Sequence, residues 1–292
     1  RLLQMTGNSL YADYMETAIY NALMASLKAD ASQIAKYSPL EGWRHEGEEQ
    51  CGMHINCCNA NGPRAFAMIP QFAYQVQDDC VRVNFYAPSE AELVLPGKKP
   101  VRLKQTTDYP QTDQIEIEVD PAKETAFTIA LRIPAWSKIA VVSVNGQPQD
   151  GVLQGAYLPV NRKWKKGDRI TVKLDLRARL VERNQAQAIV RGPIVLARDS
   201  RFGDGFVDEA SVVVSKDGYV ELTPVKAPGF AWLAFTAPMV LGTDLESNRA
   251  PKQIHFCDFA SAGNTWDKTQ RYRVWLPKTL NVMHSPYRPY NQ

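Results

Sequence analysis

The stretch from Gly47 to Phe66, GEEQCGMHINCCNANGPRAF, concentrates the cysteines of this sequence. It holds three of the five, and two of them, Cys57 and Cys58, are adjacent. Neighbouring cysteines bridge each other only with strain, so a structural disulfide between them is a poor explanation. The pair therefore indicates either a metal held by thiolates or a thiolate that does chemistry.

A zinc site is the first interpretation. Zinc takes thiolate, imidazole and carboxylate ligands, usually four. The candidate ligands follow the spacing C-x2-H-x2-C-C: Cys51, His54, Cys57 and Cys58. Glu48 or Glu49 could add an oxygen ligand. Because common structural zinc sites use two separated pairs of ligands, a reduced cysteine loop without metal stays open as the alternative.

A covalent nucleophile is the second interpretation. Zinc stabilises a bound thiolate and would hold Cys57 deprotonated at neutral pH, and a deprotonated sulfur can act as a nucleophile. The local signatures of cysteine proteases are missing here, and no histidine is marked as a partner by its position in the sequence. The remaining cysteines, Cys80 and Cys257, lie in strand-like segments and are predicted to be free thiols that pack as small apolar groups.

Two helical segments are predicted to flank the cysteine stretch. Apolar residues recur at helical spacing through residues 1–28, where Gly7 ends one helix and Asn8 or Ser9 caps the next. After an irregular connection over residues 29–50, a second helix is predicted at residues 63–69.

That second helix would begin at Pro63, which suits a first helical position, and end at Pro70. Cys57 and Cys58 would then lie in the loop before the helix N-terminus. Backbone N–H groups there favour a thiolate.

Short alternating segments follow residue 73. YQVQDDCVRVNFYAP, DQIEIEVD, AFTIALRIP and DRITVKLDL are typical of an antiparallel sandwich, and a second β-rich part follows a soft boundary near residues 176–185. We therefore predict an α+β multidomain chain with a helical part at 1–73, one β-sandwich at 74–178 and another at 179–292.

Length, composition and charge limit the kinds of partner that this chain can bind. The 292 residues allow two or three domains, and a net charge of +3 from scattered Lys and Arg argues against nucleic acid. No apolar run approaches the roughly 20 residues of a membrane span. The chain starts at Arg1 without a methionine or a signal peptide, so we expect a piece of a longer protein. Compartment, whether periplasmic, secreted or cytoplasmic, and oligomeric state stay open.

Several stretches, in order, resemble glycoside hydrolase family 127, the β-L-arabinofuranosidase family. RLLQMTGNSLYADYMETAIYNALMAS and YSPLEG look like the last part of its (α/α)6 barrel, and NCCNANGPRAF looks like its double-cysteine loop. VRVNFYAPSEAEL, LRIPAWSKIAVVSVNGQP and AIVRGPIVLAR look like strands of its accessory β-sandwiches. The likeness covers nearly the whole chain and implies a retaining glycosidase that acts on arabinose-containing plant glycans.

The resemblance also implies roles. Cys57 would be the nucleophile that forms a thioglycosyl intermediate, and Cys58 would bind Zn²⁺. The family's other ligands, a glutamate and a cysteine two residues apart, and its acid glutamate are expected upstream of Arg1. Glu49 and Cys51 imitate that ligand spacing but lie elsewhere along the fold.

Departures from the family pattern indicate a divergent branch and leave its sugar open. Ile55 stands where a third cysteine is expected, and Asn59 stands where a proline follows the pair. His54 and Arg64 are candidate substrate contacts, although Arg64 could equally form an ion pair with Glu48 or Glu49.

Aromatic residues offer weaker candidates. Trp43 and His45 could stack on sugars from the connecting loop. The tryptophans of the β-rich part could form a carbohydrate-binding face or fill cores: Trp136, Trp164, Trp232, Trp266 and Trp275. The alternative function is a non-catalytic β-sandwich module that supports a barrel or binds carbohydrate.

Overall fold

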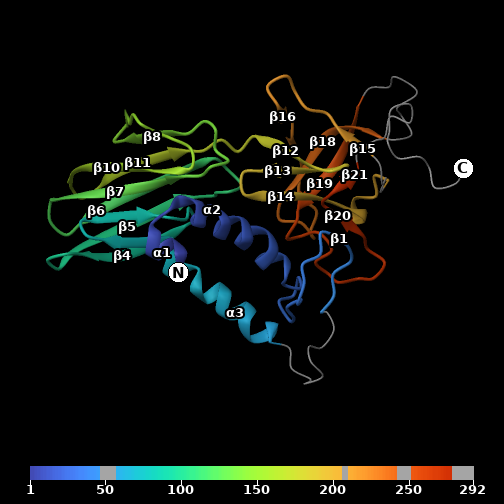
Figure 1. Ribbon diagram of the computed structural model, residues 1–292, viewed down its shortest axis with the longest axis horizontal. Coiled ribbons are helices and arrows are strands. Elements are labelled where there is room, and N and C mark those ends of the chain that lie inside the picture. Colours follow the sequence, from blue (N-terminus) through green and yellow to red (C-terminus); the bar gives the residue numbers. More distant parts are fainter. Residues whose placement is uncertain (47–56, 206–209, 242–250, 278–292) are drawn as a thin grey trace, which may run out of the picture. The chain divides into compact units, whose positions relative to one another are not determined.

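The computed structural model describes residues 1–46, 57–205, 210–241 and 251–277 (Figure 1). The chain divides into two compact units. The first unit contains Arg1–Ile19 and Pro63–Leu176, and the second contains Tyr20–Gly62 and Arg177–Gln292. Each unit is thus assembled from two separate stretches of sequence.

The helices lie near the start of the chain. They are α1 (Leu2–Thr6), α2 (Ser9–Ala18), which continues into a π-helical turn at Ile19–Leu23, α3 (Cys58–Met68) and α4 (Pro70–Ala73). Gly7 ends α1 in the left-handed conformation, and the Asn8 side chain accepts a hydrogen bond from the Leu10 N–H at the start of α2. Both predicted helix ends are therefore confirmed.

The predicted start of the next helix at Pro63 is wrong. Helix α3 begins five residues earlier, at Cys58, and Pro63 lies inside it. Pro63 lacks an N–H and removes one backbone hydrogen bond, to the Asn59 carbonyl, but it does not end the helix. Cys58 is therefore the first residue of the helix and not part of a preceding loop.

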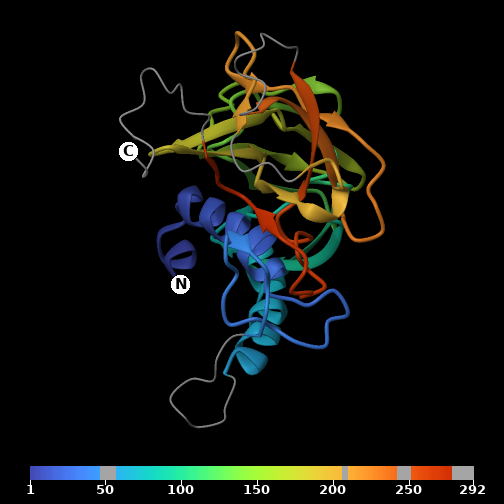
Figure 2. The same ribbon diagram turned by 90° about the vertical axis from the view of Figure 1, so that its right-hand side faces the viewer.

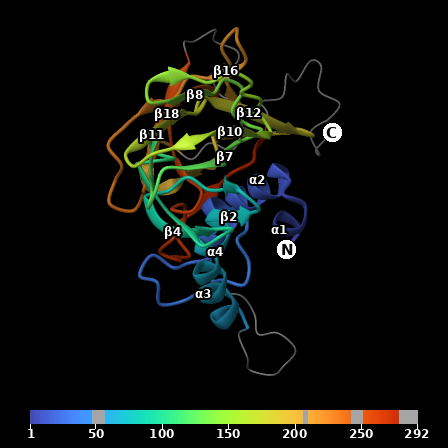
Figure 3. The same cartoon turned by 90° about the vertical axis from the view of Figure 1, so that its left-hand side faces the viewer.

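Two sheets make up the β-structure of the first unit (Figure 3). One has the strand order β10 (Ala156–Trp164), β7 (Thr125–Ile133), β3 (Cys80–Val83) and β2 (Tyr74–Gln77). The other has the order β4 (Ser89–Leu95), β5 (Lys99–Thr107), β6 (Gln114–Pro121), β11 (Asp168–Lys173), β8 (Val141–Val144) and β9 (Gln147–Pro148). Most strand pairs are antiparallel, as predicted, but β3 and β7 are parallel because β4, β5 and β6 lie between them in sequence and belong to the other sheet.

Alternation of buried and exposed residues creates the core of this unit. In β6, Ile115, Ile117 and Val119 are wholly buried while the residues between them are partly exposed. Trp164 is also wholly buried, and its indole N–H donates to the Phe127 carbonyl. Period-two patterns of this kind give each sheet one apolar face.

A buried ion network joins helix α2 to β7 within the first unit. Arg132 is wholly buried and binds both Asp13 and Glu16. Tyr109 donates a hydrogen bond to Glu16, and the backbone N–H of Ala135 donates to Asp13. The two carboxylates, three residues apart on one helix face, thereby fix α2 to the end of a strand.

The described strands of the second unit form one connected sheet (Figure 2). Its main path is β15 (Ala210–Val212), β18 (Ala234–Leu241), β19 (Lys252–Asp258), β14 (Ile194–Asp199), β13 (Ala186–Arg191), β12 (Ala178–Arg183) and β16 (Tyr219–Val220). Branches add β1 (Glu41–Gly42), β17 (Thr223–Pro224), β20 (Tyr272–Arg273) and β21 (Leu276–Pro277). The strands predicted here are thus present, but they join one sheet through branches at β13, β14 and β18.

Strand β1 comes from the connection that leads to the cysteines. It pairs with β20, which pairs in turn with β14. The domain boundaries 1–73, 74–178 and 179–292 stay a prediction. None of the helices in the described ranges is long and apolar enough to cross a membrane.

Candidate active site

Cys57 and Cys58 lie at the N-terminus of α3. Cys57 is exposed in the turn before the helix, and its carbonyl accepts hydrogen bonds from the Ala60 and Asn61 N–H groups at 3.2 and 3.0 Å. Cys58 opens the helix and is partly buried. Neither cysteine forms a disulfide bond. The pair therefore presents one accessible sulfur beside one sheltered sulfur.

The sheltered sulfur resists ionisation. Burial raises the pKa of Cys58, and the neighbouring Cys57 raises it further by a hydrogen bond and by charge, while Lys36 acts in the opposite direction. Without a bound cation Cys58 is therefore a thiol at neutral pH. A metal ion that replaced its proton would reverse this preference.

The start of α3 packs against the segment before it within the second unit. Ile34 is buried, and a Cβ at Gly62 would stand 2.2 Å from its Cδ1. Ile34 itself pairs with Leu27 in a β-bridge. Hydrogen bonds from Lys28 N–H to Gln33 O and from Ala35 N–H to Ser26 O, at 3.0 and 2.7 Å, close the same turn.

The next segment, residues 36–46, closes on itself and is anchored at several points. The Lys36 N–H donates to the Glu46 carbonyl at 3.0 Å, which brings the two ends of the segment together. The Tyr272 hydroxyl donates to the Pro39 carbonyl at 2.6 Å, and the Val274 N–H donates to the Leu40 carbonyl at 2.8 Å. The backbone just before residue 47 is therefore held firmly.

Arg44 is the strongest anchor of this segment. It is wholly buried, donates to the carbonyls of Ala25, Phe259 and Ala260, and places its guanidinium over the rings of Phe259 and Tyr272 at 4.7 and 5.0 Å. Burial lowers its pKa, and Tyr272 opposes that change. A buried guanidinium that satisfies carbonyls fixes a loop more tightly than apolar packing alone.

Trp43 and His45 flank Arg44 in the sequence. Both are exposed, and their ring centroids lie 5.7 Å apart. The Arg271 guanidinium lies 5.2 Å from the centroid of Trp43. The Trp43 ring, which was expected to stack on a sugar, is therefore already in contact with the Arg271 guanidinium.

Zinc suits the chemistry of the cysteine pair, because two adjacent thiols supply half of a tetrahedral donor set. Within the described residues, no three His, Cys, Asp or Glu side chains gather closely enough to hold a metal ion. The other predicted ligands, Glu48, Glu49, Cys51 and His54, lie outside the described residues. Arg64, the predicted substrate contact, lies on the exposed face of α3.

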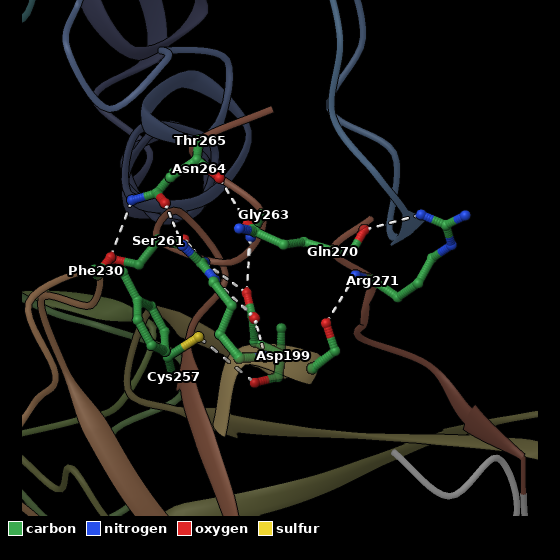
Figure 4. A network of polar contacts seen from close by, with 12 residues as sticks. Asp199, Phe230, Cys257, Ser261, Gly263, Asn264, Thr265, Gln270 and Arg271 are labelled. Carbon is green, nitrogen blue, oxygen red and sulfur yellow. Dashed lines mark hydrogen bonds and ion pairs between the residues drawn. The ribbon is translucent and has the colours of Figure 1, made fainter. Parts of the chain in front are cut away.

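Cys80 and Cys257 form no disulfide bond, as predicted. Burial raises the pKa of Cys80, and it raises that of Cys257 much further. Cys257 lies beside a polar network in which Asp199 binds Arg201 and accepts a hydrogen bond from Gly263 N–H, while Arg201 binds Asn264 (Figure 4). Hydrogen bonds within the network join these groups to one another, so Asn264 has the structural role of a turn residue.

The tryptophans of the β-rich part are divided between core and surface. Trp164 is wholly buried, Trp136, Trp266 and Trp275 are partly buried, and Trp232 is stacked on Tyr20 with the centroids 6.3 Å apart. The core alternative therefore holds for Trp164.

Sequence reasoning missed the residues that position the cysteines. Ile34, Lys36, Gly62 and Arg44 lie around the start of α3 or anchor the segment before it. A glycine followed by a proline inside a helix was one available signal, since both weaken a helix and need a tertiary reason. Arg44 carried no such signal.

Two family models match the chain. One is described as "Beta-L-arabinofuranosidase, GH127 catalytic domain" and matches residues 1–71, and the other is described as "Beta-L-arabinofuranosidase, GH127 middle domain" and matches residues 80–176. Both describe the same family and together they cover more than half of the chain.

Relatives agree with the models. The non-reducing end β-L-arabinofuranosidase of Bifidobacterium longum subsp. longum is 26% identical over 222 residues, which covers 67% of this chain and 32% of that protein. The solved GH127 β-L-arabinofuranosidase from Geobacillus stearothermophilus T6 has a TM-score of 0.77 and 22% identity, over 95% of this chain and 48% of that one. A solved GH127 β-arabinofuranosidase has a TM-score of 0.78 and 25% identity, over 95% and 47%. The chain thus spans 32 to 48% of the length of these relatives.

Proposed function

Because this chain belongs to glycoside hydrolase family 127, the family of the β-L-arabinofuranosidases, we propose that the protein containing it hydrolyses β-L-arabinofuranosides or a related sugar of plant glycans. The observation that carries the proposal is the exposed Cys57 beside the sheltered Cys58 at the N-terminus of α3. This pair lies in the part that the catalytic-domain model matches. The helices of residues 1–73 are then the last part of an (α/α)6 barrel, and the β-rich parts support it.

Cys57 is the residue that reacts. Its sulfur attacks the anomeric carbon, the carbon–oxygen bond to the leaving group breaks, and a carboxylic acid from outside the described residues protonates the departing oxygen. Water then attacks the same carbon, the carbon–sulfur bond breaks, and the water proton passes to the carboxylate. Two displacements at one carbon give net retention, as in glycosidases that use two carboxylates.

Cys58 has a different role. Its partly buried sulfur would hold Zn²⁺, together with ligands from the rest of the full-length protein rather than with Glu49 and Cys51, which imitate the family's ligand spacing. Bound zinc would stabilise the thiolate form of Cys58, which burial otherwise disfavours. His54 and Arg64 remain proposed contacts of the carbohydrate substrate.

Replacing Cys57 by Ala in the full-length protein tests this function. We expect the turnover of an aryl β-L-arabinofuranoside to fall by at least about 10³-fold, since the nucleophile is gone, while bound zinc stays near the wild-type content. Cys80→Ala is the matched control and should keep wild-type turnover, because Cys80 lies in β3. Wild-type rates in the Cys57 variant would refute the mechanism.

A hollow on the first unit favours a second candidate function, carbohydrate binding by the β-sandwich. Its volume is about 760 Å³, and it lies over the ends of β4, β5 and β6. Hydroxyl, carboxylate and ammonium groups line it: Glu90, Lys104, Thr106, Asp108, Thr112 and Glu116. Ion pairs to Arg102 and Arg169, at 3.0 and 2.7 Å, hold the two glutamates in place.

Calorimetric titration tests this second function. Arabinan oligosaccharides would be added to the protein in a Cys57→Ala background, which removes hydrolysis. Thr106→Trp fills the hollow and should weaken binding, whereas Lys216→Trp, at an exposed position of the second unit, should not. Equal binding by both variants would exclude the hollow.

A further inference from the structure

Gly62 and Cys58 lie on the same face of α3, because residues four apart in a helix are stacked one turn above the other. Gly62 is buried, and its missing side chain leaves room for Ile34. A Cβ at this position would stand 2.2 Å from Cδ1, 3.2 Å from Cγ2 and 3.4 Å from Cγ1 of Ile34. The isoleucine thus sits directly against the helix backbone, one turn from the sheltered cysteine.

Ile34 has little room to move. Only 7% of its surface is exposed, and its backbone is fixed by the bridge to Leu27 and by the hydrogen bond from Ala35 N–H to Ser26 O. The two γ carbons are set by that backbone and a single torsion. Cδ1 can turn about the last torsion of the side chain, but the γ carbons would still lie 3.2 and 3.4 Å from a carbon added at position 62, so the helix start or the isoleucine must shift by a few tenths of an ångström.

The first turns of α3 have little intrinsic tendency to be helical. Asn59, Asn61 and Gly62 are poor helix formers, and Pro63 removes a backbone hydrogen bond. Helices of this kind depend on tertiary packing for their position. The contact with Ile34 is therefore well placed to decide where the helix, and the cysteines at its start, come to lie.

We propose that Ile34 and Gly62 are positioning residues for Cys57 and Cys58, and that their close contact sets the height and rotation of the helix start that presents the reactive sulfur. The inference rests on the proposed function of Cys57. It predicts that the summed side-chain volume of residues 34 and 62 governs the rate of the chemical step.

A methyl exchange across the contact tests the proposal in the full-length protein. Gly62→Ala adds one carbon against Ile34 and should lower kcat by about 10-fold, because a misplacement of about 1 Å at a reacting group costs about 100-fold and this shift is smaller. Ile34→Val removes Cδ1 and should lower kcat by less than about 3-fold. The double variant conserves the total volume and should regain at least a third of the wild-type kcat.

Gly229→Ala is the control glycine. Its φ is not in the left-handed region and nothing lies within 4 Å of the added carbon, so it should have wild-type kcat. A second readout is independent of catalysis: the rate at which iodoacetamide modifies Cys57 in metal-free protein. That rate should change in Gly62→Ala and return in the double variant, with thermal melting confirming that each variant is folded at the assay temperature.

Different outcomes would overturn the positioning role of the Ile34–Gly62 contact and the proposed function of Cys57. Wild-type kcat and alkylation in Gly62→Ala, or a double variant as slow as Gly62→Ala, would overturn the positioning role. An active Cys57→Ala variant would instead overturn the proposed function, and it would leave the alkylation readout of the contact intact.

Discussion

Arg132 and Glu16 form an ion pair inside the first unit, with the guanidinium Nη2 2.6 Å from the carboxylate Oε1 and both side chains at most 2% exposed. The pair joins β7 to a helix more than one hundred residues away in sequence. Removing one partner of such a pair leaves a buried charge without its counterion, and this is more damaging than the absence of the pair as a whole.

Arg132→Met is therefore expected to destabilise the protein by about 3–5 kcal/mol. Urea unfolding followed by circular dichroism measures the loss. Lys163→Ala is the control, since Lys163 and its partner Glu124 are 64% and 55% exposed and such pairs contribute at most about 1 kcal/mol. An equal loss of unfolding free energy in the two variants would contradict the claim that burial makes the Arg132 ion pair more important than the exposed one.

Asp168 should make the free energy of unfolding depend on pH in the acidic range. Burial alone raises its pKa, but hydrogen bonds from the Lys165 N–H and the Asn145 amide, with the charge of Arg162, outweigh burial, so the pKa is lowered. A lowered pKa stabilises the folded state above the unfolded value of about 3.9, and the stabilisation is lost as pH falls through the folded value.

Asp168→Asn should accordingly cost about 1–3 kcal/mol at pH 7, because a donor replaces an acceptor that faces the Lys165 N–H. The difference from wild type should be smaller at pH 2.5 than at pH 7, because pH 2.5 lies below the unfolded value of about 3.9 and the stabilisation by the charged carboxyl is lost as pH falls towards the folded value. Urea midpoints at the two pH values measure the change. A difference that stays constant would show that the charge of Asp168 is unimportant.

The thiols should differ in reactivity. Cys57 is exposed, whereas Cys257 is wholly buried with a pKa well above its usual value. Because the thiolate is the reactive form, iodoacetamide at pH 8 should modify Cys57 in the native protein and leave Cys257 unmodified. Peptide mass mapping measures both sites, and modification in urea, where all thiols are open, calibrates the maximum. Rapid native labelling of Cys257 would contradict this burial.

Zinc content should depend on the two cysteines unequally. The full-length protein is expected to hold about one zinc, Cys58→Ala to lose most of it, and Cys57→Ala to keep it. The 292-residue chain alone is expected to hold little zinc, because of the four ligands it supplies Cys58 and at most also Cys57. Elemental analysis after purification under reducing conditions measures each case. One full equivalent in the chain alone would make Cys51, Glu49 or His54 ligands.

Local signals predicted the elements that depend on local chemistry. Gly7 and Asn8 mark helix ends because φ and capping are properties of a few neighbouring residues. The alternating strands were recognisable for the same reason. Pro63 misled, because a proline at a first helical position and a proline tolerated inside a helix look alike without the tertiary contacts that hold the second kind.

The frame of the candidate site could not be predicted in this way. Ile34 meets Gly62 across 28 positions, and Arg44 meets Phe259 across 215. Such contacts depend on which segments the fold brings together. The cysteine pair stood out because its density is a local property, while the residues that position it are ordinary in type.

The division of the chain has a consequence for how such a protein can be inherited. The sequence passes between its two units at Ile19–Tyr20, Gly62–Pro63 and Leu176–Arg177, and the first two passages run through continuous helical segments. A recombination event at any single one of these points would separate residues that complete one unit. The helical residues at the start of the chain and the β-rich residues that follow are therefore expected to be inherited together during evolution.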